Sequence, residues 1–369
     1  MKLQLLADNM RRLRTARRLS QRALADAAGL SLPTVKNIEG AKKEPRMASV
    51  EAVARAMSVP VGELFAPVRQ LQIVRFRSRK RMQNRENILA EVARRLDELE
   101  YLEGILDSRI PFHLGGGRKQ YSSSRTAASA ELCRRKLGLG ADPILDIGSV
   151  LENAGVKLLP IASASEGFFG LAVGEEDGGP AVVVNVYERI TPERRIFTTA
   201  HELGHILLHQ QAFDAGKTDE NKQEEEEADN FAGHFLMPNE SFERYWHEAA
   251  GLNLVKRVFK VKGIFRVSYK TVLHRLVEKK IADETIWQRF TYAYEKEFDR
   301  KLPYKEEPEG LDGAEPFGLK QLVSFEDRAR RLVRKAVEAE LITVARGAEM
   351  LRISIEEMQQ LLKDWETVR

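Results

Sequence analysis

Apolar residues recur at helical spacing along most of the 369-residue chain. Between residues 3 and 66 they form several short periods interrupted by glycine and proline, which predicts four or five short helices packed as one small domain. Longer apolar stripes predict helices at about 86–106 and 127–137. From residue 193 onward the pattern is again mainly helical.

The middle of the chain alone shows the shorter patterns typical of strands. Apolar runs predict three short strands, at 156–161, 167–173 and 181–186, after a helix at 147–154. The fold class expected is therefore multidomain and mainly α, with a small α+β domain between helical regions.

Three segments have the composition of connectors. Residues 68–82 alternate basic and apolar side chains, and we interpret them as a basic connector. Glycines and serines at 115–124 predict a flexible joint, and prolines and acids at 305–316 predict a second linker.

The composition excludes several classes of protein. With 43% hydrophobic and 31% charged residues, the chain is typical of a folded protein of two or three domains. Its single cysteine, Cys133, excludes an intramolecular disulfide and a zinc site built from several thiolates, so a metal site must use His and carboxylate side chains. No apolar run approaches the ~18 residues of a membrane span, and no signal-peptide cleavage site is evident. We expect a cytoplasmic protein with no membrane partner.

The net charge of +4 hides an uneven distribution along the chain. Residues 1–82 carry a net charge of +12, residues 83–239 carry −10 and residues 240–369 carry +2. A basic segment joined to an acidic one suggests a different partner for each, with double-stranded DNA as the first candidate for the basic end.

Residues 19–40 hold two helical periods on either side of Gly29, the arrangement of a helix-turn-helix. Ser31 is suited to cap the second helix, and Pro33 is tolerated in its first turn. The pattern over about residues 1–66 resembles the XRE family of DNA-binding domains. We expect DNA to be contacted by Gln21, Ser31, Leu32, Pro33, Thr34, Lys36 and Asn37.

The pentapeptide HELGH at 201–205 has the spacing of a zinc site. On a helix, residues four apart share a face, so His201 and His205 can offer imidazole nitrogens to one ion, while Glu202 projects toward a water molecule. His209 lies about 12 Å from His201 along the helix axis at 1.5 Å per residue, which is too far for a ligand of the same ion. We interpret His209 as a structural or rim residue.

The third ligand is expected in the acidic run at 224–227. Glu225 follows His205 at the spacing of the thermolysin-type gluzincin peptidases, and by that resemblance it supplies the ligand, with Glu226 as the alternative. Asp229, one turn later, is expected to bind the far nitrogen of a ligand imidazole and fix its tautomer. We interpret the remaining acids as a solvated helix face, namely Glu224, Glu226 and Glu227.

Together these motifs resemble the ImmA/IrrE family of metallopeptidase-like proteins, in its subgroup with an N-terminal XRE domain. The resemblance rests on FTTAHELGHILLH, on the pattern E-x-x-A-D-x-F-A followed by LMP at 236–238, and on the preceding LGLGADPILDIGSVLENAGVKLLP. It covers about residues 1–66 and 130–280 and implies a gluzincin-like zinc metallopeptidase domain. The chain departs from the family at Asp229, where the family more often has Asn or His.

The expected domain order follows from these motifs. A helix-turn-helix domain at 1–67 is followed by a basic and helical linker at 68–126 and a zinc metallopeptidase domain at 127–285. Residues 286–369 are expected to form a helical region that is either a second helix-turn-helix or a dimerisation element.

Peptide hydrolysis at such a site needs a base, a bound substrate and a donor to the transition state. Zinc lowers the pKa of a water molecule to about 7, and Glu202 would take its proton and pass it to the leaving amine. The peptide is expected to add as an extended strand along the edge near 181–186. His234 and Tyr187 are the candidate transition-state donors.

Two functions from different classes are open. The first is a DNA-binding zinc endopeptidase that cleaves a protein partner, by family analogy a transcriptional repressor, and so controls stress or mobile-element genes. The second is a transcription regulator whose zinc-site domain senses a ligand or metal without proteolysis. The presence of Glu202 favours the first, because a sensor needs no general base. XRE domains usually bind two-fold operators, so we expect a homodimer.

Overall fold

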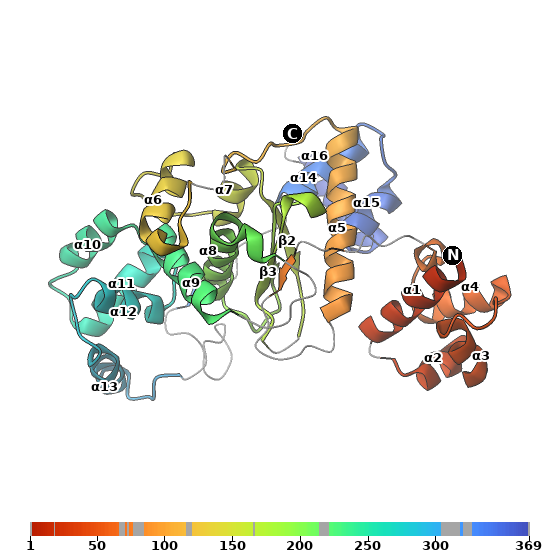
Figure 1. The fold of residues 1–369 in the computed structure, drawn as a ribbon, viewed down its shortest axis with the longest axis horizontal. Coiled ribbons are helices and arrows are strands. Elements are labelled where there is room, and N and C mark those ends of the chain that lie inside the picture. The colour runs from red at the N-terminus through yellow and green to blue at the C-terminus, as the bar shows by residue number, and fades with distance from the viewer. Residues whose placement is uncertain are drawn as a thin grey trace. The chain divides into compact units, whose positions relative to one another are not determined.

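The structure is a computed structural model, and within it the chain is mainly helical with one small sheet, as the sequence patterns predicted (Figure 1). It describes residues 2–17, 19–65, 71, 74–76, 85–115, 120–164, 167–213, 221–303, 318–319 and 327–367. The expected linker at 305–316, residues 116–119 of the flexible joint and most of the basic connector lie outside the described residues. None of the described helices is long and apolar enough to cross a bilayer.

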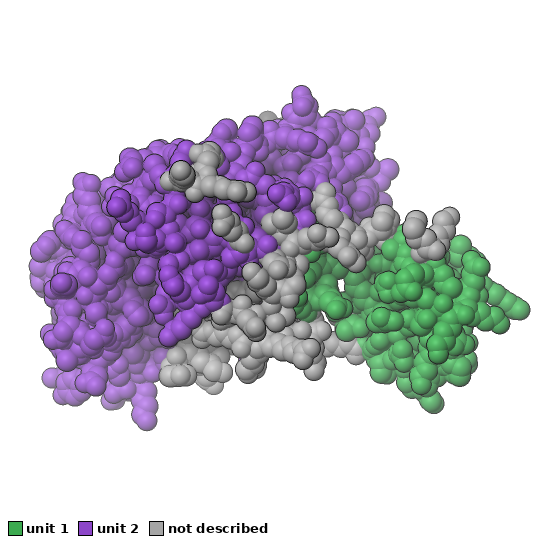
Figure 2. Space-filling view, in the orientation of Figure 1, with its two compact units in different colours: residues 1–71, 81–96 green, residues 72–80, 97–369 purple. Residues whose placement is uncertain are grey.

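The chain divides into two compact units (Figure 2). The first comprises residues 1–71 and 81–96, and the second comprises residues 72–80 and 97–369. The helix α5 (Arg85–Ile105) contributes residues to both.

The first unit begins with short helices around one apolar core. They are α1 (Lys2–Ala16), α2 (Gln21–Ala28), α3 (Leu32–Glu39), α4 (Met47–Ala56) and the short 3-10 helix η1 (Val61–Leu64). Ser20 and Ser31 cap α2 and α3 by accepting hydrogen bonds from the backbone amides of Ala23 and Thr34. Gly29 ends α2 with a φ of 64°, a conformation that favours glycine. The fold predicted for this segment is confirmed.

The sheet of the second unit has four strands within the described residues. They are β1 (Val74–Phe76), β2 (Lys157–Ile161), β3 (Gly170–Val173) and β4 (Ala181–Asn185). Their order is β1-β3-β4-β2, with β2 parallel to β4 and β3 antiparallel to both β4 and β1. The three strands expected from the sequence are present, and β1 is an addition from the segment interpreted as a basic connector.

The sequence placed a peptide-binding edge near 181–186, and this expectation is wrong. β4 lies between β3 and β2, and all five of its residues are buried. Alternating apolar residues predict that a strand forms but not which neighbours it acquires, so the order of strands was not available from the pattern.

Helices cover the sheet and position the functional residues. The helices around the sheet are α6 (Thr126–Lys136), α7 (Ile147–Asn153), α8 (Pro192–Leu208) and α9 (Lys222–Leu236). α8 packs on β3 and β4 and also against α9. Two glycines allow this close packing. A Cβ at Gly170 would lie 2.5 Å from Thr198 Cγ2, and a Cβ at Gly204 would lie 3.0 Å from the Phe231 ring.

The rest of the unit is helical. Its helices are α10 (Asn239–Glu248), α11 (Leu254–Phe265), α12 (Tyr269–Glu278), α13 (Ile286–Phe298), α14 (Asp327–Glu338), α15 (Val344–Leu351) and α16 (Ile355–Thr367). Residues of α11 to α13 share the core of α8 and the sheet. On α16 the charged side chains at exposed positions are Glu356, Glu357, Lys363, Asp364 and Glu366. Both alternatives expected for this region, a second helix-turn-helix and a dimerisation element, stay predictions.

Candidate metal centre and DNA-binding face

The HELGH residues lie on the buried side of α8. Thr191 begins this helix by accepting a hydrogen bond from the amide of Arg194, and Pro192 occupies its first turn. His201, Glu202 and His205 are all fully buried. The two imidazoles are four residues apart on one helix face, as the spacing predicted.

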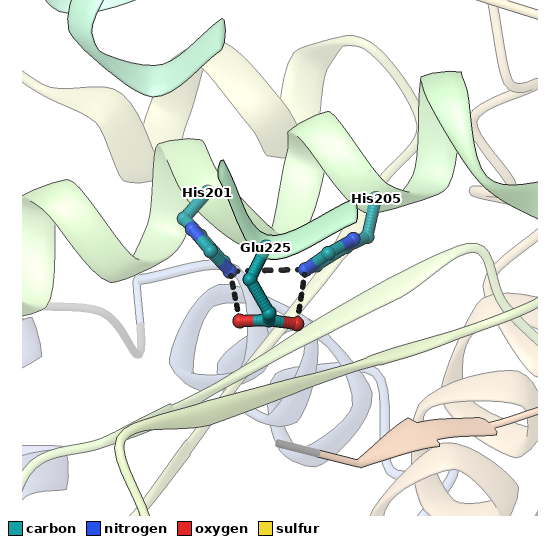
Figure 3. Close-up of side chains that lie close together, drawn as sticks. All are labelled: His201, His205 and Glu225. Atoms are coloured by element: carbon teal, nitrogen blue, oxygen red, sulfur yellow. Dashed lines mark hydrogen bonds and ion pairs between the residues drawn. The ribbon is translucent and has the colours of Figure 1, made fainter. Parts of the chain in front are cut away.

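The first turn of α9 brings a carboxylate to these imidazoles (Figure 3). Glu225 Oε2 lies 3.4 Å from His201 Nε2, and Glu225 Oε1 lies 3.3 Å from His205 Nε2. The two Nε2 atoms are 2.9 Å apart. The three residues could therefore hold one metal ion, since their ligand atoms all lie within 4.8 Å of one another.

Both imidazoles are oriented by hydrogen bonds at their far nitrogens. His201 Nδ1 lies 2.7 Å from Asp229 Oδ1, and because a carboxylate only accepts, Nδ1 carries the proton and Nε2 presents a lone pair. This is the contact expected of Asp229.

A second hydrogen-bonded chain orients the other imidazole. His209 Nε2 lies 2.8 Å from Glu227 Oε2, and His209 Nδ1 lies 2.9 Å from His205 Nδ1. The Glu227 carboxylate holds the His209 proton on Nε2, so His209 Nδ1 accepts from His205 Nδ1. His205 Nε2 therefore also presents a lone pair to the cluster. His209 thus has the structural role that was one of the two expected for it, and no signal in the sequence indicated that it orients the His205 imidazole.

The donor set fits a metal cation. Burial lowers the pKa of His205 well below 6.5 despite the nearby Glu225 carboxylate, so its imidazole is neutral. Two imidazole lone pairs and an ionised carboxylate converge on one point, where they repel one another unless a cation lies between them. This set of ligands is typical of zinc sites that leave a position open.

Glu202 is the next residue after a ligand and faces the sheet. A Cβ at Gly170 would lie 3.2 Å from Glu202 Cγ, so the Glu202 side chain packs against the start of β3. The expected role of Glu202 as a general base stays a prediction.

The acidic run on α9 is not the solvated face that the sequence suggested. Glu224 forms an ion pair with Arg75 of β1, and Glu227 accepts a hydrogen bond from His209 Nε2. Only Glu226 fits that interpretation, because its side chain is 66% exposed and lies 3.8 Å from Lys222. This exposure also rules out Glu226 as the alternative ligand. The partners of Glu224 and Glu227 belong to other elements, so the acidic run alone gave no signal for them.

The structure contradicts the donor role expected of one candidate residue and leaves that of the other open. His234 Nε2 lies 2.7 Å from Glu278 Oε1, and His234 follows Glu225 by nine residues, about two and a half turns at 3.6 residues per turn. It therefore lies on the opposite side of α9 from the ligand, and the expectation that it is a donor is wrong. Tyr187 lies two residues after the end of β4, and its donor role stays a prediction.

Most of the expected DNA-contacting residues lie at the surface of the first unit. Ser31, Pro33, Lys36 and Asn37 are exposed, and Leu32 and Thr34 are half-buried. Gln21 is half-buried, and its side chain donates a 2.7 Å hydrogen bond to Glu39, which also binds Arg14. The Gln21 amide is thus held within the domain, and its contact with DNA stays a prediction.

Comparisons with known proteins identify two domains. Residues 153–277 match the peptidase M78 family, described as the IrrE N-terminal-like domain, and residues 5–66 match a helix-turn-helix domain family. The resemblance predicted from the motifs is confirmed for these two domains. No curated protein matches the chain. The crystal structure of ComR from Streptococcus suis matches with 11% identity over 100% of this chain and 96% of that chain, with a TM-score of 0.17.

Proposed function

We propose that this chain, which joins a helix-turn-helix domain to an IrrE N-terminal-like domain, is a DNA-binding regulator and a zinc endopeptidase. It cleaves a protein partner such as a transcriptional repressor and thereby controls stress or mobile-element genes. The observation that carries the proposal is the convergence of acceptor atoms from His201, His205 and Glu225 beside the buried carboxylate of Glu202. A site built only to sense a ligand has no need of that carboxylate.

The residues of the chain have separate tasks in this chemistry. Zinc held by His201, His205 and Glu225 would supply Lewis-acid chemistry at the reacting carbonyl. Glu202 takes the proton of the attacking water molecule and returns it to the amine that leaves. Asp229 and His209 keep the two imidazole lone pairs directed at the ion. Tyr187 is proposed as a donor to the transition state.

DNA binding is proposed to place α3 in the major groove. Support comes from the exposed Lys36 and Asn37 on one side of this helix, opposite the buried Val35 and Ile38. The protein would act as a homodimer on a two-fold operator. Sequencing of genomic DNA fragments retained by the purified protein tests this, and a Lys36→Ala, Asn37→Ala double variant is expected to retain fragments without the enriched sequence.

Metal content is the first test of the peptidase site. Elemental analysis of purified wild type is expected to give about one zinc per chain. Glu225→Ala removes a ligand and is expected to lose the zinc, whereas Glu226→Ala changes an exposed acid on the same helix and is expected to keep it. Wild type without metal after purification under zinc-replete conditions would overturn the proposed site.

Cleavage is tested separately with Glu202→Gln, which is nearly isosteric. We expect this variant to keep its zinc and to lose proteolysis, because the amide cannot accept the proton of water. Mass spectrometry of protein N-termini in cells expressing either form is expected to reveal new termini only with wild type. New termini that are undiminished in the variant would refute the role of Glu202. If wild type binds zinc but cleaves nothing, the proposed endopeptidase is refuted and the regulator that senses a ligand or metal without proteolysis is favoured.

A further inference from the structure

The edge of β3 that follows Gly170 is occupied by the chain itself. β1 pairs antiparallel with β3, with Val74 opposite Val173 and Phe76 opposite Leu171. Leu171 is the neighbour of Gly170, against which Glu202 packs. Three residues from the segment after the helix-turn-helix domain therefore lie along the strand that an extended peptide would use to reach the site.

The middle residue of β1 binds the acidic run of α9. The Arg75 guanidinium forms an ion pair with Glu224 through Nη1 and lies 3.2 Å from Glu225 Oε1 through Nη2. The arginine side chain is 11% exposed, and those of Glu224 and Glu225 are 21% and 12% exposed. An arginine held by two carboxylates with little access to water is a specific contact, stronger than a surface ion pair.

The contacts of β1 resemble those of a bound extended peptide in two respects. The backbone of β1 adds a strand to β3, which supplies affinity without regard to sequence, and the Arg75 side chain enters an acidic pair, which supplies selectivity. The acidic pair, Glu224 with Glu225, includes a proposed metal ligand. A peptide bound here therefore lies beside the catalytic residues.

We propose that the β3 edge and the acidic pair form a binding site for an extended peptide carrying an arginine or lysine, and that residues 74–76 occupy it as an internal ligand. This inference rests on the proposed function, whose substrate class and regulation it specifies. The substrate is a basic, extended segment of a protein partner, and it must displace β1 to pair with β3.

An internal strand competes effectively with a free peptide because it belongs to the same chain as the binding site, so its effective concentration does not change with the protein concentration. A tethered ligand commonly acts at an effective concentration of about millimolar, so a free peptide at micromolar concentration must bind with much higher affinity or be excluded. The protein is thereby protected from cleaving unrelated extended chains.

The test measures peptide binding to the full-length protein without requiring cleavage. The probe is a fluorescein-labelled peptide with the sequence of residues 70–80, and its fluorescence anisotropy reports binding. Arg75→Asp replaces attraction to the acidic pair by repulsion, and we expect this variant to bind the probe at least tenfold more tightly than wild type. Arg346→Asp removes an arginine that pairs with Glu349 on α15, and it is the matched control expected to bind like wild type.

The acidic pair is tested with a second peptide. A probe with alanine in place of the arginine that corresponds to Arg75 is expected to bind the Arg75→Asp variant at least tenfold more weakly than the arginine probe. Glu224→Gln in the Arg75→Asp background is expected to reduce that difference. Equal binding of both probes would overturn the assignment of the acidic pair.

Hydrogen exchange provides a readout that does not depend on the probe. The β3 amides that face β1 are expected to exchange at least tenfold faster in Arg75→Asp than in wild type, while amides of α8 keep their protection. Unchanged exchange rates of these β3 amides would refute the inference that β1 occupies a peptide-binding edge. If Arg75 served only to position Glu225, Arg75→Asp would lose metal without gaining peptide affinity, and this result would also overturn the inference. Because neither readout needs proteolysis, failure of the proposed peptidase activity is distinguishable from failure of this inference.

Discussion

His209 offers the sharpest test of how the metal centre is held, because it is predicted to control metal affinity without touching the ion. His209 Nδ1 accepts a hydrogen bond from His205 Nδ1 over 2.9 Å, and His209 Nε2 binds Glu227 over 2.8 Å. His209→Ala removes the acceptor and leaves His205 free to adopt the other tautomer, in which Nε2 carries the proton and cannot bind metal.

The size of the effect follows from the loss of one orienting hydrogen bond. Removal of such a partner from a metal-binding imidazole typically lowers metal affinity by 10–100-fold, which corresponds to about 1.4–2.7 kcal/mol. His209→Asn retains an acceptor oxygen at the place of Nδ1, so we expect it to lose less than about fivefold. Glu226→Gln on the neighbouring α9 is exposed and should leave affinity unchanged.

Competition with a chromophoric zinc chelator measures these affinities on the full-length protein. The expected order of affinity is wild type, then His209→Asn, then His209→Ala. His205→Ala, which lacks a ligand, is expected to be weaker than all three. Zinc affinity of His209→Ala within a factor of two of wild type would refute the argument that this chain of hydrogen bonds fixes the ligand tautomer.

Three further predictions concern stability and reactivity. Gly170→Ala should lower the unfolding free energy by about 1–3 kcal/mol, because its Cβ would meet Thr198 and a backbone oxygen. Gly251→Ala is the control, because a Cβ there meets open space, and thermal unfolding of the two variants measures the difference. Burial raises the pKa of the Cys133 thiol to about 12, so Ellman's reagent should react at least about 100-fold faster after unfolding in urea. Burial raises the pKa of Glu278, but His234 and an arginine outweigh it and lower this pKa to about 2. The resulting stability, about 1 kcal/mol for a 44% exposed side chain, is present above pH 4.5 and lost toward pH 2, and Glu278→Gln should lack this pH dependence in urea titrations.

Local sequence patterns predicted much of the metal centre. Residues four apart share a helix face whatever the rest of the fold does, so His201 with His205 and Glu225 with Asp229 were each paired by spacing alone. The caps at Ser20 and Ser31 and the glycine that ends α2 likewise depend only on neighbouring residues, so the helix-turn-helix could be predicted from the sequence.

The same local rules failed wherever a partner came from another element. Glu224 and Glu227 resemble solvated acids in the sequence, yet one meets Arg75 from 149 residues away and the other meets His209. His234 has the chemistry of a donor, but its position on α9 turns it toward Glu278.

The sequence by itself determined which residues share a helix face, where helices begin and end, and the resemblance that carries the metal ligands. Tertiary structure alone decided the order of the strands, the burial of β4 and the occupation of the β3 edge by β1. The alternation of Val74, Arg75 and Phe76 is compatible with a strand, but three residues acquire that conformation only from a neighbour. Hydrogen bonds between strands and ion pairs between helices join residues distant in sequence, and no local periodicity encodes them.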